Sequence, residues 1–166
     1  VTSAAQGAAE AMFSLATSMT DDQSIDVALL YTQLGISLGA DADIMYTLLG
    51  DTYEDMKRYD KALAAYGKVP AASPLHTNAQ MEEAVCLQRL DRKDEALARL
   101  KDVVGREPKN FDAIVTLGNL YRNNEDYGQA AAAFHMVPRE KKLQEIYAHL
   151  DKLWPGLSKH VQTSQV

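Results

Sequence analysis

Residues 46–53 read YTLLGDTY, and the pattern Tyr46-x-x-Leu49-Gly50-x-x-Tyr53 inside this stretch returns twice at an offset of 34 residues. The later copies are Gln80-x-x-Glu83-Ala84-x-x-Leu87 and Ile114-x-x-Leu117-Gly118-x-x-Tyr121. A fixed period of about 20–50 residues is the sequence signature of repeat architectures, in which each unit buries its apolar face only by stacking on a neighbour. The period therefore predicts a chain of stacked, similar units.

Each copy continues with two further positions in the same register. In the second half of each copy, an alanine stands at a fixed distance after the small residue of the pattern. A large apolar residue comes four positions after that alanine. These pairs are Ala62 and Tyr66, Ala96 and Leu100, and Ala130 and Phe134. Small residues facing one another allow two helices to approach closely, and large side chains fill the space beside the contact. We therefore expect each copy to be a helical hairpin with these positions in its core.

The combined pattern resembles the tetratricopeptide repeat (TPR), whose signature is W-x₂-L-G-x₂-Y, then A-x₃-F, then P. Two copies reach the proline, at Pro74 and Pro108. The resemblance extends over residues 5 to 138 and is similar in arrangement to long bacterial proteins of this family. It implies an all-α fold, a right-handed superhelix of helical hairpins, and a role as a binding scaffold rather than an enzyme.

The repeat register divides the chain into a single expected domain, residues 5–154. The clear hairpins are expected at about 43–74, 77–108 and 111–138. A degenerate hairpin at about 9–40 places Ala16 and Ala28 in register, whereas Tyr31 falls one residue early. Terminal repeats are often atypical because one side lacks a neighbouring repeat.

The register ends after Pro138, and residues 139–154 show a different apolar pattern. Their apolar residues have the spacing of a one-sided helix; they are Leu143, Ile146, Tyr147, Leu150, Leu153 and Trp154. We expect this helix to cap the last hairpin, with attachment to a second copy or to a longer protein as the alternative. Pro155 and Gly156 end it, and residues 155–166 are expected to be an unstructured tail.

Composition excludes several classes of function. The formal net charge of −6 argues against nucleic-acid binding, which needs clustered Lys and Arg to neutralise phosphates. No apolar run approaches the roughly eighteen residues of a membrane span. The single cysteine, Cys86, excludes an internal disulfide and is expected in the core. Because the sequence does not begin with methionine, we expect a processed chain or a fragment, and cytoplasmic and periplasmic locations both remain open.

No catalytic, cofactor-binding or metal-ligating pattern is present. The four histidines are dispersed, and the sequence contains no Gly-rich phosphate loop, nucleophile elbow or His-Glu-x-x-His motif. Asp51, Glu54 and Asp55 form an acidic group on an expected helix, which favours a solvated or groove-lining face over acid–base chemistry. We therefore expect neither an enzyme nor a cofactor.

The family resemblance implies a concave groove lined by the first helix of each hairpin. Positions two, five, nine, twelve and thirteen of that helix face the groove in such arrays. Glu10 and Ile44 stand at position two of their hairpins. The main groove residues implied for this chain are Phe13, Thr47, Asp51, Glu54, Asp55, Met81, Val85, Gln88, Arg89, Val115, Asn119 and Arg122. Phe13, Met81, Val85 and Val115 are expected to form an exposed apolar strip between acidic and basic ends.

These expectations favour a non-catalytic scaffold that binds a peptide or helix of a partner protein in the groove. One alternative is a structural segment of a larger repeat protein, or of a homo-oligomer joined through the terminal helix. A bacterial secretion-type chaperone is a further alternative. The sequence favours a monomer and does not identify the partner.

Overall fold

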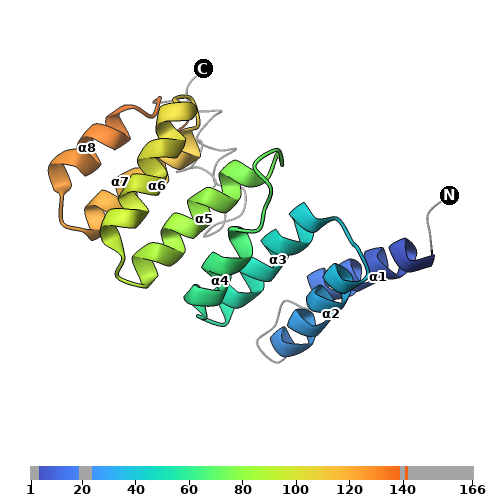
Figure 1. Cartoon of the computed structure of the whole chain (residues 1–166). Coiled ribbons are helices and arrows are strands. Elements are labelled where there is room, and N and C mark those ends of the chain that lie inside the picture. The colour runs from blue at the N-terminus through green and yellow to red at the C-terminus, as the bar shows by residue number, and fades with distance from the viewer. Residues whose placement is uncertain (1–3, 19–23, 139–140, 142–166) are drawn as a thin grey trace, which may run out of the picture. The chain divides into compact units, whose positions relative to one another are not determined.

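The computed structural model describes residues 4–18, 24–138 and 141, and these residues form helices without a strand (Figure 1). The all-α expectation is therefore confirmed for the described chain. The helices are α1 (Ala4–Ser18), α2 (Ile25–Ser37), α3 (Ala42–Asp55), α4 (Tyr59–Tyr66), α5 (His76–Arg89), α6 (Lys93–Arg106), α7 (Phe111–Asn123) and α8 (Tyr127–His135). Among the described helices, none is both long enough and apolar enough to cross a membrane.

The chain divides into two compact parts, Val1–Lys109 and Asn110–Val166, which we describe separately. In the first part α1 pairs with α2, α3 with α4, and α5 with α6, and consecutive hairpins contact through α2 with α3 and α4 with α5. In the second part α7 pairs with α8. The expected terminal helix at 139–154 and the tail at 155–166 lie outside the described residues, except for Lys141.

Each hairpin depends on a close contact between a small residue and a large side chain. Tyr66 is 1% exposed, and a Cβ added at Gly50 would overlap its ring. In the second part, a Cβ added at Gly118 would lie 2.5 Å from Phe134 Cε1. In the third hairpin the equivalent residues, Ala84 and Leu100, are both fully buried. The hairpins are thus tightly packed at Gly50 and Gly118, but the side chains nearest to the glycines are Tyr66 and Phe134 and not the alanines expected from the sequence.

The turns inside the hairpins also repeat. Lys57, Asp91 and Glu125, which stand 34 residues apart, all have positive φ angles of 57°, 59° and 63°. The backbone N–H after each one reaches back five residues, as in the bond of 2.8 Å from Arg58 to the Tyr53 carbonyl. This bond satisfies a carbonyl at the end of the first helix and reverses the chain into the second.

The degenerate hairpin keeps the repeat register more closely than the sequence indicated. Thr32, and not Tyr31, occupies the position of Tyr66 and is fully buried. Its hydroxyl is satisfied within α2, because it donates to the Ala28 carbonyl at 2.8 Å. Tyr31 is only half-buried. From the sequence, the aromatic Tyr31 was compared with this position. Thr32 fits the buried position because its hydroxyl already has a hydrogen-bond acceptor within the helix.

Substituting Gly50 with alanine tests the helix contact. The added Cβ forces Tyr66 or the helices to shift, so we expect Gly50→Ala to destabilise the protein by about 1–3 kcal/mol. Gly105→Ala is the matched control, because nothing lies within 4 Å of its added Cβ in α6. Alanine is the better helix former, so the control should gain about 0.5–1 kcal/mol. Urea unfolding followed by circular dichroism measures both changes, and equal effects would contradict the contact.

Candidate protein-interaction surface

A cavity of about 470 Å³ opens beside α1 and the start of α3. Its lining includes Glu10 and Phe13 from α1 and Ile44 from α3, three residues at implied groove positions. Gly39 to Asp41, in the connection between α2 and α3, complete one side. Ile44 is 42% exposed, whereas Phe13 is half-buried. The cavity therefore combines an accessible apolar side chain with carboxylates at Glu10 and Asp41.

An acidic cluster, Asp51, Glu54 and Glu82, lies where α3 meets α5. The hydroxyl of the buried Tyr66 donates to Asp51 Oδ1 at 2.7 Å and to Glu54 Oε2 at 3.3 Å. Asp51 is exposed as a residue, yet partial burial of its carboxyl raises its pKa above the ordinary value, against the lowering effect of the Tyr66 hydrogen bond. Burial likewise raises the pKa of Glu54. Tyr66 thus fills the core with its ring and contacts this acidic cluster through its hydroxyl.

Glu82 is a member of this cluster that sequence reasoning missed. Burial raises the pKa of its carboxyl, and the nearby charges of Glu54 and Asp51 raise it further. Arg89, also on α5, acts in the opposite direction on the Glu54 pKa. Because these charges affect one another's pKa values, the charged side chains of α3 and α5 lie close together on one surface. Glu82 was missed because it stands at position six of its repeat, next to the implied groove positions but not among them.

The expected exposed apolar strip is wrong at Met81, which is only 9% exposed and belongs to the core. Val85 and Gln88 are half-buried on the same helix. Thr47 is also half-buried, and its hydroxyl donates to the Asp43 carbonyl at 2.9 Å. Asp55 and Arg89 are exposed, as a groove or a solvated face requires. Among the apolar residues at implied groove positions in the described chain, Ile44 on α3 is the exposed one.

The remaining implied groove residues lie on α7 in the second part. Val115 and Asn119 are half-buried, and Arg122 is exposed. The structure describes this part by itself. Their contribution to a groove shared with α3 and α5 therefore stays a prediction.

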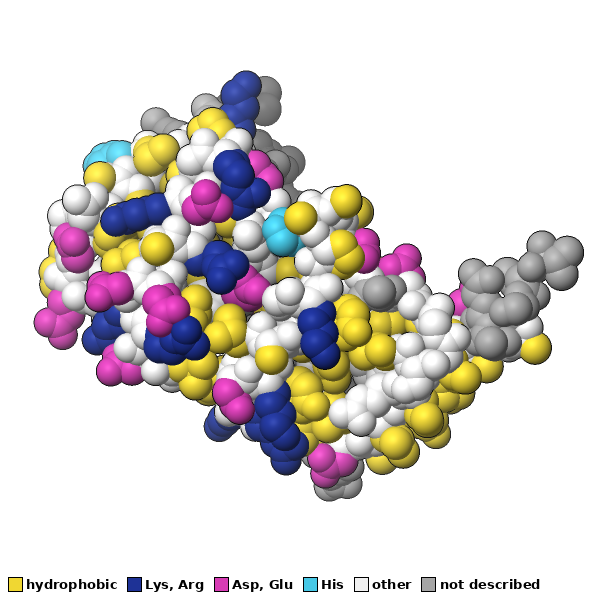
Figure 2. Space-filling model, in the orientation of Figure 1, with side chains coloured by type: hydrophobic (Ala, Val, Ile, Leu, Met, Phe, Trp, Pro, Cys, Tyr) yellow, Lys and Arg dark blue, Asp and Glu magenta, His cyan; other side chains and the backbone are white. Residues whose placement is uncertain are grey.

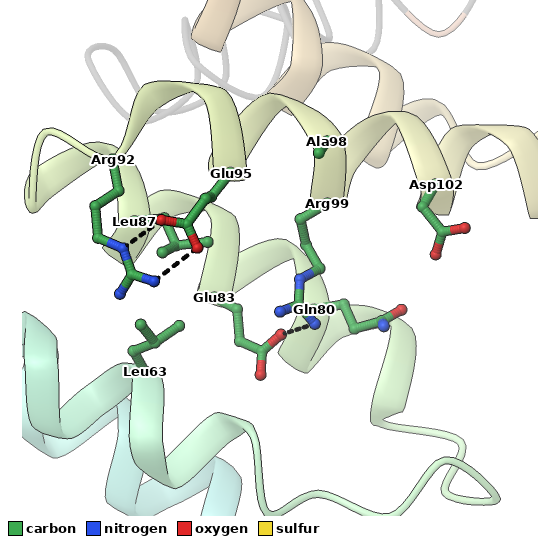
Figure 3. Close-up of a pocket in the computed structure, with 9 residues that line it drawn as sticks. All are labelled: Leu63, Gln80, Glu83, Leu87, Arg92, Glu95, Ala98, Arg99 and Asp102. Atoms are coloured by element: carbon green, nitrogen blue, oxygen red, sulfur yellow. Dashed lines mark hydrogen bonds and ion pairs between the residues drawn. The ribbon is translucent and has the colours of Figure 1, made fainter.

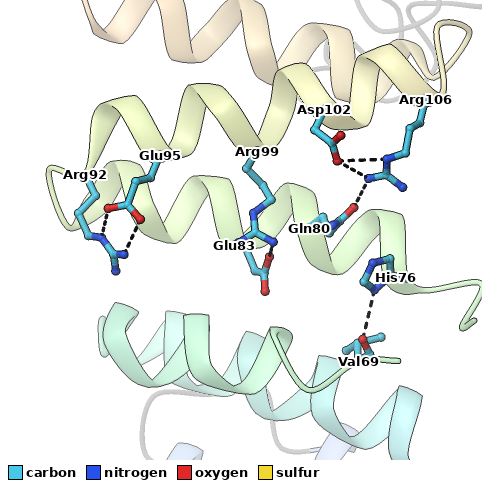
Figure 4. Close-up of polar contacts among 9 residues, drawn as sticks. All are labelled: Val69, His76, Gln80, Glu83, Arg92, Glu95, Arg99, Asp102 and Arg106. Carbon is cyan, nitrogen blue, oxygen red and sulfur yellow. Dashed lines mark hydrogen bonds and ion pairs between the residues drawn. The ribbon is translucent and has the colours of Figure 1, made fainter. Parts of the chain in front are cut away.

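A second hollow, the outer notch, has a volume of about 510 Å³ and lies between α4, α5 and α6 (Figure 3). Its lining is Leu63, Gln80, Glu83, Leu87, Arg92, Glu95, Ala98, Arg99 and Asp102. The arginines along α6 point to carboxylates (Figure 4). Arg92 Nη2 lies 2.7 Å from Glu95 Oε2, and Arg99 Nη1 lies 2.7 Å from Glu83 Oε2. Arg106 contacts Asp102 at 3.0 Å and also donates to Gln80. The arginines of this surface are therefore internally compensated.

The Glu83–Arg99 pair replaces an apolar pair of the neighbouring hairpin. Thirty-four residues earlier the same two positions hold Leu49 and Ala65, both buried. Glu83 is 5% exposed, so its carboxylate depends on the guanidinium for compensation. A buried ion pair of this kind contributes little net stability relative to a well-packed apolar pair. We assign the Glu83–Arg99 ion pair a structural role, because each of its two charges is compensated by the other.

The described residues contain no group of three or more His, Cys, Asp or Glu side chains arranged to hold a metal ion. Cys86 is buried, as expected from the sequence. What the described surface offers is a cavity of mixed polar and apolar lining, an acidic cluster and a compensated outer notch. This arrangement suits recognition of a partner by apolar contact and charge complementarity.

Comparison with protein families identifies the repeat. Models described as tetratricopeptide repeat match residues 44–69 and 91–151. ER membrane protein complex subunit 2-A of Xenopus laevis is 31% identical over 84 residues, which covers 51% of this chain and 28% of that protein. Subunit 2 of Xenopus tropicalis matches to the same extent. The matched region thus spans about 28% of the length of these curated relatives.

Solved structures share the fold. The crystal structure of MamA superposes with a TM-score of 0.67 at 16% identity, covering 84% of this chain and 81% of that chain. The crystal structure of YrrB, described as a TPR protein with an unusual peptide-binding site, gives a TM-score of 0.62 at 16% identity. That match covers 93% of this chain and 74% of YrrB. At these identities the likeness establishes the fold alone.

Replacing the buried ion pair tests its structural role. Arg99→Ala leaves the Glu83 carboxylate uncompensated, so we expect a loss of about 2 kcal/mol. The double variant Glu83→Leu with Arg99→Ala recreates the Leu49–Ala65 pair and should recover most or all of that loss. A double-mutant cycle from urea unfolding measures the coupling. Equal destabilisation by the single and double variants would contradict the assignment.

Removing the Glu82 charge tests the acidic cluster through pH. The pKa of Glu82 is raised above its ordinary value of 4.5, so the folded state binds this proton more tightly than the unfolded state. The associated stability is present below pH 4.5 and is lost as the pH rises through the raised value. We therefore expect Glu82→Gln to melt higher than the parent at pH 7 and alike below pH 4.5.

Glu125→Gln is the control for this measurement, because it removes the same charge from an exposed turn in the second part. Thermal melts of the three proteins across this pH range give the comparison. If the melting temperature of Glu82→Gln equals that of the parent at every pH, then the ionised carboxyl of Glu82 does not destabilise the folded state.

Proposed function

Because this chain belongs to the tetratricopeptide-repeat family, whose members are typically non-catalytic interaction modules, we propose that it is a scaffold that binds a peptide or helix of a partner protein. The binding surface is the groove lined by the first helices of the hairpins. In the first part these helices are α1, α3 and α5. No chemical step is assigned to the chain.

The observation that carries the proposal is the cavity beside α1 and α3. Phe13 and Ile44 were implied as groove residues by the repeat register, and they line one hollow of about 470 Å³. Ligand sites are typically concave and largely apolar, with a few placed polar groups. A cavity of this size suits one or two apolar side chains of a peptide.

Charge defines the second requirement for the ligand. Asp51, Glu54 and Glu82 lie at the α3–α5 surface, where burial raises the pKa of each carboxyl and the charge of neighbouring carboxylates raises it further. A basic side chain placed there would relieve that repulsion. The ligand we propose therefore carries an apolar anchor for the cavity and a Lys or Arg for the cluster.

Among the structural neighbours, YrrB is described as having an unusual peptide-binding site. This supports peptide recognition as a property that the fold can carry. The curated relatives are named as subunits of a protein complex. That observation favours assembly with other proteins as a second candidate function, which the exposed surface of the first hairpin also supports.

Affinity capture with the chain as bait, followed by titration of the purified partner, tests the groove. Ile44→Asp places a charge in the cavity, and we expect it to weaken binding at least about tenfold, the size of a lost apolar contact. Ala71→Asp adds the same charge to an exposed site in the connection between α4 and α5 and should bind as the parent does. Asp51→Asn with Glu54→Gln should weaken binding mainly at low salt. A partner that binds the Ile44→Asp protein unchanged would rule out this cavity.

A further inference from the structure

A third hollow of the first part, which we call the lysine hollow, has a volume of about 410 Å³. Its lining comes from α2, from α3, and from α4 with the turn that follows α4. Figure 2 shows Lys and Arg side chains beside hydrophobic ones over the region of α4. Because α2 contacts α3 and α3 contacts α4, the lysine hollow lies between two stacked hairpins.

Two lysines give this hollow its charge. Lys61 and Lys68 line it, and its described lining contains no aspartate or glutamate. Both lysines are exposed, and among the described residues neither forms an ion pair with a carboxylate. The whole chain, by contrast, has 23 acidic and 17 basic residues. The lysine hollow is therefore a local cationic site on an acidic protein.

Two tyrosines of α3 orient these ammonium groups. Lys61 Nζ lies over the Tyr53 ring at 5.6 Å from the ring centroid, and Lys68 Nζ lies over the Tyr46 ring at 5.2 Å. An aromatic face attracts a cation without taking up its N–H groups as a carboxylate does, so each ammonium can still donate to a ligand. An oriented side chain also loses less conformational freedom when a ligand binds.

The equivalent hollow of the next hairpin has the opposite arrangement of charge. Thirty-four residues later, Lys61 and Lys68 correspond to Glu95 and Asp102, which line the outer notch. Each of these two carboxylates is paired with an arginine three or four residues away, at 2.7 Å and 3.0 Å. The outer notch thus neutralises its charges within the chain. The lysine hollow, at the same place in its own hairpin, leaves two positive charges for a ligand to neutralise.

The surface between the two lysines is made of small and apolar side chains. Ala64 and Ala65 stand between them on α4, and Leu49 lines the hollow from α3. Lys61 and Lys68 are seven residues apart, which corresponds to about two helical turns or roughly 10 Å. A ligand that fits has two negative charges at that spacing and an apolar side chain between them.

We propose that the lysine hollow binds an acidic helix of a partner protein. Two Asp or Glu residues seven positions apart on that helix contact Lys61 and Lys68, because their spacing matches that of the lysines. An apolar residue three or four positions after the first carboxylate lies on the same helix face and packs against Ala64. The Tyr53 hydroxyl accepts a hydrogen bond of 3.3 Å from Gln33 Nε2 and can donate its own proton to one of the carboxylates.

This site is separate from the groove of the proposed function. The groove combines the cavity beside α1 with the acidic cluster and takes a basic ligand, whereas the lysine hollow takes an acidic one. The cavity and the lysine hollow share no lining residue. The two proposals therefore assign the chain two ligands of opposite charge, and either proposal can fail without the other.

Fluorescence anisotropy with a labelled helical peptide tests the proposal. The Glu peptide carries Glu at two positions seven residues apart and Leu three positions after the first Glu; the Gln peptide has Gln at both Glu positions. We expect the full chain to bind the Glu peptide about tenfold more tightly, with a smaller difference at high salt. Lys61→Gln with Lys68→Gln should remove most of this preference.

The matched control, Lys93→Gln with Lys109→Gln, removes the same charge from exposed positions outside the hollow and should keep the preference. Circular dichroism checks that both double variants fold. Vesicles containing phosphatidylserine are a second probe, because they present negative charge without the spacing of a helix.

Charge exchange locates the contact. Lys61→Glu with Lys68→Glu should lose the Glu peptide and bind a peptide that carries Lys at the same two positions, whereas Lys93→Glu with Lys109→Glu should do neither. Ile44→Asp should keep the Glu peptide, which separates this site from the groove. Equal binding of the Glu and Gln peptides overturns the proposal, as does a preference that survives Lys61→Gln with Lys68→Gln. Binding of the vesicles without binding of the Glu peptide also overturns it.

Discussion

The close approach of the two helices in each hairpin is the constraint on which the rest of this structure depends. Gly50 leaves room for the Tyr66 ring, and Gly118 leaves room for Phe134. The two helices of a hairpin are closely packed there, and the second helix then contacts the first helix of the next hairpin, as α2 does with α3 and α4 with α5. Leu49 on α3 and Met81 on α5 are buried in these hairpins. The packing of these hairpins therefore depends on one contact that recurs at Gly50 and Gly118.

Tyr66 joins this packing to the surface chemistry. Its ring fills the space beside Gly50, while its hydroxyl donates to Asp51 and Glu54. Burial and the neighbouring carboxylates raise the pKa of this hydroxyl, so it remains a donor at physiological pH. A core residue thus orients two carboxylates that would otherwise move freely. Glu82 adds a third carboxylate, and the three together make the α3–α5 surface acidic.

The fold was predictable because the helix contact selects small and large residues at fixed spacing, and the spacing recurs without insertion. The site was less predictable, since burial at a groove position depends on the neighbouring helix. Met81 was expected to be exposed and is buried, whereas Glu82 was overlooked beside it. Thr32 was missed because a buried threonine has no apolar signature.

The central claim is that the working surface for a peptide ligand lies along α1, α3 and α5. Chemical-shift mapping of the isotopically labelled chain, titrated with its captured partner peptide, tests it most directly. The account predicts that the largest shifts fall at Phe13, Ile44, Asp51, Glu54 and Glu82. Shifts confined to the outer sides of α4 and α6, at residues such as Ala64 and Ala98, would contradict it.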